Sequence, residues 1–139
     1  IGIPDRILLK PGSLDEPEWE VMKQHTVIGC NILSGSDSHV IQMADQIASA
    51  HHEKWDGSGY PKGLKGSEIP LWGRISAIAD VFDALTTERP YKKAFPLDHS
   101  LEILKQCRGT HFDPAVFDAF FSIEEEILSI RRKYDDPVS

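Results

Sequence analysis

Apolar residues recur at helical spacing along most of the chain, and this pattern limits the possible folds more than any other feature. Spacings of three and four residues bring side chains to one side of a helix. Between 71 and 85 such a stripe consists of Leu71, Ile75, Ile78, Phe82 and Leu85. A second face of the same segment carries Gly73, Ala77, Asp80 and Ala84. We therefore expect an all-α fold.

Other segments have the same period. Helices are predicted over 15–33, from 39 to about 51, over 97–107 and from 113 onward. The first has an apolar stripe formed by Trp19, Met22, Ile28 and Ile32, and the second has an inner face formed by Val40, Met43, Ala44, Ile47 and Ala48. Residues 1–14, punctuated by Pro4, Pro11 and Gly12, are expected to be extended. Residues 131–139 look like a frayed tail after a single domain spanning 1–130.

Local signals mark where two of these helices begin. Asp15 with Glu18 three residues later is a capping-box pattern, and a proline at position 17 is tolerated in a first turn. Asp113 followed by Pro114 predicts a second helix start. Capping residues therefore mark the starts of two helices that the apolar period also predicts.

Composition narrows the function classes. The 139 residues are 40% hydrophobic and carry a formal net charge of -7, which argues against DNA binding through a basic face. An anionic ligand would need locally gathered cations or metal ions. No apolar run approaches the roughly 20 residues that cross a bilayer, so no membrane contact is expected. Cys30 and Cys107 lie far apart and read as reduced thiols, which favours a cytoplasmic location.

Histidines stand where the second helix gives way to the glycine-rich loop 53–69. His51 extends the inner face of that helix, His52 follows it, and His25 falls on the stripe of the first helix. Alone, His25 reads as a core residue and His52 as a solvent-facing residue at a helix end. Together with Asp80 they form an imidazole and carboxylate set from three helices, as in the metal sites of helical bundles.

The adjacency of His51 and His52 carries a further expectation. Neighbours on a helix point about 100° apart, so the two rings would serve different ions. Metal pairs roughly 3.5–4 Å apart recur in enzymes that hydrolyse phosphate esters.

Charged residues follow Asp80 along the chain. Asp83 shares its helix face, and Arg89, Lys92 and Lys93 form a cationic cluster in an acidic chain. Such groups beside a metal would position a phosphodiester. The alternative is a solvated basic turn.

Four segments carry a resemblance: "IGIPDRILLKPG", "HHEKWDGSGYPKGLKGSEIP", "AIADVFDALTTERPYKKAF" and "GTHFDP". In this order the chain resembles the HD-GYP family, metal-dependent phosphodiesterases that hydrolyse cyclic di-GMP, up to about residue 121. The resemblance implies an HD-type helical bundle with a long glycine-rich loop after the second helix.

The resemblance also assigns roles to residues. It implies two or three divalent ions, iron or manganese, held by His25, His51, His52 and Asp80, with Asp83, Arg89 and Lys92 facing the substrate phosphates. The signature tripeptide is Gly59, Tyr60 and Pro61. In the family this loop is also linked to contacts with GGDEF domains, so a non-catalytic interaction module is the alternative function.

One family feature does not occur in these 139 residues: the His-Asp dyad that precedes the "IGIPD" segment. We expect the dyad upstream of Ile1 in a longer parent protein, the alternative being a degenerate homologue. Because the dyad supplies shared metal ligands, the 139-residue chain alone is expected to bind metal weakly and to be inactive.

Overall fold

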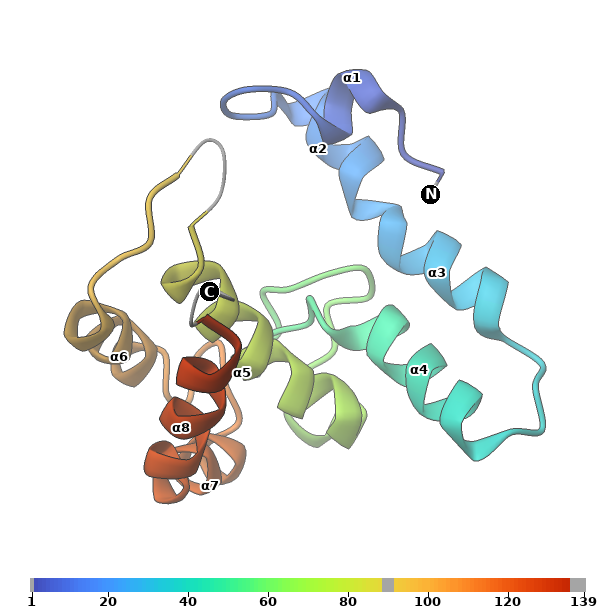
Figure 1. The fold of residues 1–139 in the computed structure, drawn as a ribbon. Coiled ribbons are helices and arrows are strands. Elements are labelled where there is room, and N and C mark those ends of the chain that lie inside the picture. Colours follow the sequence, from blue (N-terminus) through green and yellow to red (C-terminus); the bar gives the residue numbers. More distant parts are fainter. Residues whose placement is uncertain (1, 89–91, 136–139) are drawn as a thin grey trace.

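The chain folds as an all-α protein, as predicted. The computed structural model describes residues 2–88 and 92–135, and within them every regular element is helical, with only isolated β-bridges (Figure 1). No helix in these residues is long and apolar enough to cross a membrane. The elements are α1 (Asp5–Leu8), α2 (Glu16–Lys23), α3 (His25–Leu33), α4 (His39–Ala50), the 3-10 turn η1 (Gly66–Glu68), α5 (Leu71–Thr86), α6 (Leu97–Gln106), α7 (Pro114–Ser122) and α8 (Glu124–Asp135).

The helix predicted over 15–33 is divided into α2 and α3 at Gln24. The backbone N–H of Gln24 donates to the carbonyl of Val21, three residues back, which tightens the turn there. The start of α2 is as predicted, because the Asp15 carboxylate accepts from the N–H of Glu18 and the Glu18 carboxylate accepts from the N–H of Asp15. The segment before it is not wholly extended, since it contains α1.

The main core is built around α5. Ile78, Phe82 and Leu85 of its apolar stripe are buried and pack with side chains of α6, α7 and α8. Leu104 and Phe112 are buried in the same cluster. The other end of the stripe is more open, with Leu71 and Ile75 exposed to solvent. The predicted helix therefore forms, and its C-terminal half supplies the core.

The small-residue face of α5 lets α4 approach closely. A Cβ added at Gly73 would lie 2.6 Å from the Cβ of Ala50, the last residue of α4. Two ordinary side chains could not meet at this separation. The end of α4, where His51 follows, is therefore held against α5, and Asp80 lies two helical turns along from Gly73.

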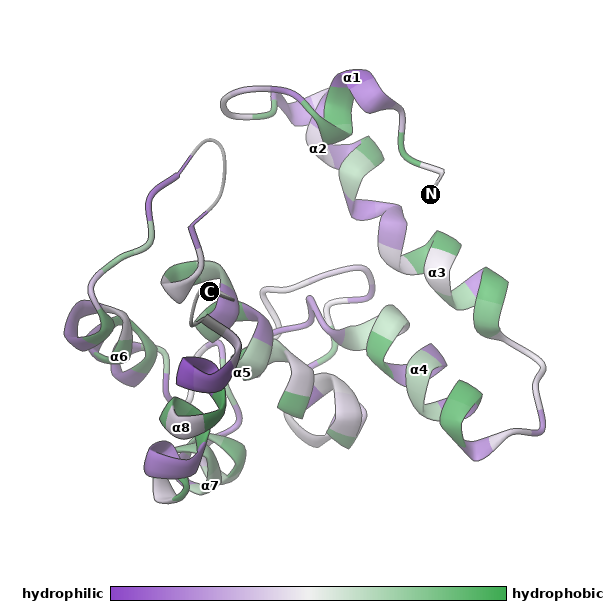
Figure 2. Cartoon of the chain, viewed as in Figure 1, coloured by the Kyte–Doolittle hydropathy of each residue, from purple (hydrophilic) through white to green (hydrophobic). Residues whose placement is uncertain are grey.

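Several residues expected on inner faces are exposed, so that part of the prediction is wrong. Val40 has 71% of its surface exposed and Ile32 has 63%, and Trp19 is also exposed. Figure 2 shows apolar stretches, in green, along both α3 and α4. The reason is tertiary: α3 and α4 pack on each other, α5 packs on α4, and α2 makes a smaller contact with α3, so the remaining faces of α3 and α4 are left to solvent.

The segment expected to fray after 130 begins as helix. α8 continues to Asp135, and the Arg131 guanidinium donates to the carbonyl of Thr86 at 2.7 Å. This bond joins α8 to the end of α5, so residues 131–135 are ordered helix rather than tail.

Candidate metal centre

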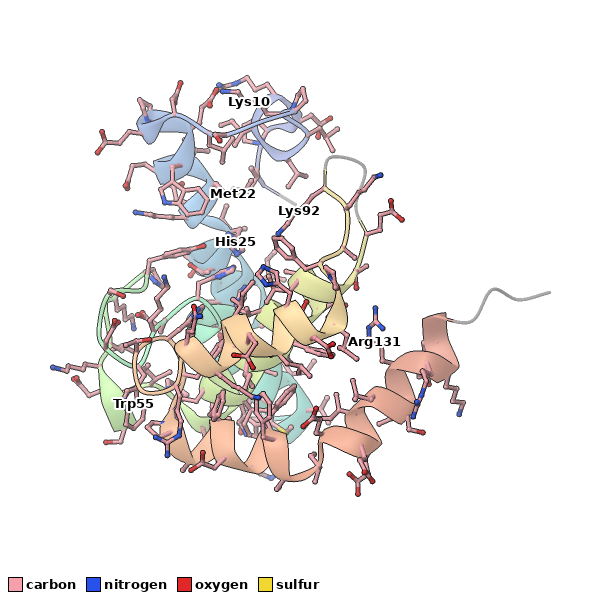
Figure 3. The ribbon with its side chains drawn as sticks, turned by 90° about the vertical axis from the view of Figure 1, so that its left-hand side faces the viewer. Lys10, Met22, His25, Trp55, Lys92 and Arg131 are labelled. Carbon is pink, nitrogen blue, oxygen red and sulfur yellow. The ribbon has the colours of Figure 1, made fainter. Side chains whose placement is uncertain are left out.

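Three of the four predicted metal ligands come together. His25 is the first residue of α3, while His51 and His52 follow the last residue of α4. One ring nitrogen from each of the three lies within 4.8 Å of the others. Figure 3 labels His25 where α3 begins. The packing of α3 against α4 creates this cluster.

Backbone carbonyls orient two of the rings. The Nδ1 of His25 lies 2.7 Å from the carbonyl of Met22, and the Nδ1 of His51 lies 2.7 Å from the carbonyl of Ile47. A carbonyl only accepts, so Nδ1 carries the hydrogen and donates in both rings. In the neutral rings each Nε2 then presents a lone pair, and the two Nε2 atoms lie 3.4 Å apart.

This arrangement fits a metal ion. Two lone pairs facing each other repel unless a cation lies between them. Imidazole nitrogens about 2.0–2.1 Å from a tetrahedral ion would themselves be roughly 3.3 Å apart, close to the spacing seen here. A backbone carbonyl on the opposite ring nitrogen is the usual partner of a metal-bound histidine. The donor set of His25 and His51 is therefore chemically suited to a divalent ion.

His52 is held in its neutral form. Burial, followed by the neighbouring His51, His25 and His111, lowers the pKa of His52 from 6.5 to about 4. At neutral pH the ring is therefore unprotonated, which is the form that binds metal.

His51 and His52 do not lie within regular helix, so their rings need not point about 100° apart. Regular helix stops at Ala50, and His51 occupies the C-cap position. The His51 and His52 ring centroids are only 4.1 Å apart. Their nitrogens thus reach one shared space, and binding to different ions stays a prediction.

Asp80 lies beside the histidines but is not part of the three-residue donor group found in the described residues. Although Asp80 as a whole is exposed on α5, its carboxylate has lost part of its water, which raises its pKa. His51 acts in the opposite direction and Asp83 in the same direction. These charge effects indicate that Asp80 is near His51, so its role as a ligand stays a prediction.

Two of the three predicted substrate residues belong to the described part of the chain. Asp83 is exposed and accepts a hydrogen bond from the Thr87 hydroxyl at 2.9 Å. The Lys92 ammonium sits over the Phe95 ring, 4.7 Å from its centroid, on the segment between α5 and α6. Arg89 lies outside the described residues.

The loop containing Gly59, Tyr60 and Pro61 forms one wall of the centre. The Tyr60 ring stacks on the His52 imidazole with centroids 5.0 Å apart and planes 22° apart. The N–H of Tyr60 donates to the carbonyl of His52 at 3.1 Å. The Trp19 ring meets Tyr60 edge-on from α2. The tripeptide is thus in direct contact with a candidate ligand.

Two residues that shape this wall are not among those predicted from the sequence. Glu53 is 1% exposed and accepts hydrogen bonds from the loop, and Trp19, predicted as part of an apolar stripe, contacts Tyr60. The adjacency of Glu53 to the histidine pair was the available signal. For Trp19, the sequence carried no sign of its contact with Tyr60.

The motif "GTHFDP" accepts hydrogen bonds from the beginning of the glycine-rich loop. Trp55 donates from its N–H to the carbonyl of His111, and Asp56 donates to the carbonyl of Thr110. The His111 ring stacks on Phe112, with centroids 4.5 Å apart. This segment anchors the first part of the loop to the connection between α6 and α7.

Protonation of the buried His111 is expected to lower the stability of the folded protein in acid. Burial is the largest cause that lowers its pKa from 6.5 to about 4, so the folded protein binds this proton more weakly than the unfolded chain does. Protonation therefore favours unfolding, and the loss of stability begins as pH falls below about 6.5 and levels off below about 4. We expect His111→Gln to reduce the fall in melting temperature across this window. The exposed His99→Gln is the control, and an equal effect of both changes would contradict the prediction.

Comparison with known proteins places this site in a family. The family model described as an HD domain matches residues 1–116. A cyclic di-GMP phosphodiesterase of Thermotoga maritima is 52% identical over 136 residues, which are 98% of this chain and 37% of that protein. A 3'3'-cGAMP-specific phosphodiesterase 2 of Vibrio cholerae is 46% identical over 98% of this chain and 26% of its own length.

A solved structure shares the fold. The crystal structure of a cyclic GMP-AMP specific phosphodiesterase of V. cholerae aligns with a TM-score of 0.61 and 24% identity, over 81% of this chain and 25% of that one. The chain spans about a third or less of the length of these relatives. The matched family and the quoted motifs agree. The chain belongs to the HD domain family and carries the motifs of its HD-GYP branch.

Proposed function

We propose that the protein containing this chain hydrolyses the phosphodiester bonds of cyclic di-GMP in a metal-dependent reaction. The observation that carries the proposal is the pair of Nε2 atoms of His25 and His51, 3.4 Å apart with both Nδ1 atoms bonded to backbone carbonyls. A neutral His52 lies in the same cluster. This is a preformed nitrogen donor set for divalent ions.

The residues divide into two roles. His25, His51, His52 and Asp80 would hold two or three ions, iron or manganese, which supply an activated water and offset charge on the phosphate when bound. Asp83, Arg89 and Lys92 would position the nucleotide beside them. A chain of net charge -7 needs such local cations to receive a dianionic ligand.

The names of the relatives support the substrate class. The Thermotoga relative is named a cyclic di-GMP phosphodiesterase, and one Vibrio relative is named as specific for 3'3'-cGAMP. Both substrates are cyclic dinucleotides joined by phosphodiester bonds. Cyclic di-GMP is favoured here because the Xanthomonas campestris relative, at 56% identity over 86% of this chain, also bears that name.

Turnover by the full-length protein tests the proposal. Purified protein loaded with Mn²⁺ or Fe²⁺ should convert cyclic di-GMP to a linear product, and a chelator should stop the reaction until metal is returned. 3'3'-cGAMP supplied in parallel measures specificity. A metal-loaded protein that hydrolyses neither dinucleotide would refute the proposed activity.

The cationic cluster after α5 gives a separate prediction. Replacing Arg89 by alanine should weaken cyclic di-GMP binding by about 1.5–3 kcal/mol, the cost of losing a hydrogen bond to a charged group. Lys92→Ala should cost less, because an ammonium cannot grip two oxygens as a guanidinium fork does. Titration calorimetry on metal-loaded protein measures both effects, with Lys105→Ala, at an exposed lysine of α6 outside this cluster, as control.

Metal content and melting temperature should change little in these variants. If the melting temperature of Arg89→Ala collapses instead, Arg89 stabilises the fold and the substrate role is lost. A cytoplasmic location and binding of GGDEF domains by the Gly59–Pro61 loop stay predictions. The latter would make the chain an interaction module rather than an enzyme.

A further inference from the structure

Glu53 is a buried carboxylate with no place in the metal-ligand set. Only 1% of its surface is exposed, although it lies next to His52 in the chain. A carboxylate removed from water to this degree is costly unless hydrogen bonds replace the lost water. Its partners therefore indicate what it does.

Both carboxylate oxygens are used by the loop. Oε1 accepts from the N–H of Lys62 at 2.7 Å, and Oε2 accepts from the N–H of Leu64 at 2.9 Å. Hydrogen bonds to an ionised acceptor are stronger than those between neutral groups. Glu53 thus faces the loop rather than the histidines, and it fastens the chain just after Pro61.

A second attachment lies just before Pro61. Tyr60 donates from its N–H to the carbonyl of His52, and the backbone of Gly59 packs directly on the backbone of residues 52–54. The loop is therefore held to the chain around His52 on both sides of Pro61. Between these attachments the Tyr60 ring lies parallel to the His52 imidazole.

The stacked Tyr60 ring limits how His52 can turn. One face of the imidazole is covered at 5.0 Å between centroids, and the His25 ring meets it edge-on at 4.9 Å. Neither Nδ1 nor Nε2 of His52 has a backbone carbonyl partner of the kind that orients His25 and His51 among the described contacts. The loop supplies the missing constraint.

We infer that Glu53 is a positioning residue for the metal centre: by fastening the loop, it keeps Tyr60 over His52 and fixes the imidazole in its ligating orientation. This inference rests on the metal centre proposed above. Partners that orient a ligand typically contribute about 10–100-fold to metal affinity.

The test compares single and double variants of the full-length protein. In Glu53→Gln one oxygen becomes an NH₂ group that faces a backbone N–H, so one attachment is lost. We expect Co²⁺ to bind about tenfold more weakly or worse, with an altered visible spectrum. Tyr60→Ala should have a similar effect, and Tyr60→Phe should retain the affinity because it keeps the ring.

The double variant separates positioning from general damage. If Glu53 acts through Tyr60, Glu53→Gln should weaken Co²⁺ binding little further in the Tyr60→Ala protein. The matched control is Glu68→Gln, an exposed carboxylate in the same loop that accepts one backbone N–H, from Lys65 at 3.3 Å. Glu68→Gln should bind Co²⁺ like the unmodified protein.

Amide hydrogen exchange provides a readout that needs no metal. The amides of Lys62 and Leu64 should exchange faster in Glu53→Gln and remain protected in Glu68→Gln. Additive losses of Co²⁺ affinity, unchanged affinity, or a general loss of helical circular dichroism in Glu53→Gln would each overturn the inference. If the unmodified protein binds no Co²⁺, the metal centre itself is refuted, while the exchange data still report on the loop.

Discussion

Replacing His51 by alanine is expected to remove most bound metal and nearly all of the proposed phosphodiesterase activity from the full-length protein. His51 supplies one of the two facing Nε2 atoms and also lies near Asp80. Loss of a partner that merely orients a ligand costs about 10–100-fold in metal affinity, so loss of the ligand itself should exceed about 100-fold. Metal analysis of dialysed protein and a cyclic di-GMP assay measure the two effects.

The control for this change is His39→Ala. His39 is an exposed histidine at the start of the same helix, α4. Helical circular dichroism should be nearly unchanged in both variants, because His51 follows the last helical residue. Full metal content in His51→Ala would contradict the assignment of the centre.

His52→Ala tests whether the adjacent rings each bind metal. A loss of metal and rate comparable with that of His51→Ala is expected. Retention of both in His52→Ala would mean that His52 is not a ligand and that the two-ion interpretation of the pair is wrong.

Among alanine substitutions of glycines in the loop, Gly59→Ala is expected to lower the free energy of unfolding most. The added Cβ would overlap the carbonyl oxygen of His52 and the amide nitrogen of Lys54, and it would lie 2.7 Å from the carbonyl carbon of Glu53. These are backbone atoms that cannot rotate away. Overpacking usually costs about 1–3 kcal/mol and more where the neighbours are rigid, so we expect a loss of about 3 kcal/mol.

Gly66→Ala is the matched control in the same loop. Gly66 has a φ of +59° and open space around the Cβ position, so alanine there meets only the conformational cost of about 1–2 kcal/mol. Thermal unfolding should show that Gly59→Ala melts about 10 °C below the unmodified protein, since 1 kcal/mol corresponds to roughly 3 °C in a domain of this size. Equal melting temperatures and equal metal content in the two variants would contradict the close contact between Gly59 and the backbone of residues 52–54.

Local signals in the sequence determined most of the helices of this protein, though not α1 or the division between α2 and α3. The apolar period of α5, the Asp15 and Glu18 capping box and the start at Asp113 each depend on neighbours three or four residues away. The long motifs also identified the family and pointed to the three histidines. Such features need no knowledge of which helices pack together, and for that reason they could be read from the chain alone.

Tertiary packing decided the rest. The exposure of Val40 and the contact between Trp19 and Tyr60 depend on which surfaces meet, and helical period does not contain that information. The same holds for the facing nitrogens of His25 and His51, which arise where α3 packs on α4. Glu53 shows the difference most clearly. The sequence shows that Glu53 follows the histidine pair. Its hydrogen bonds with Lys62 and Leu64 form only because the loop folds back over it, and a buried carboxylate needs such donors.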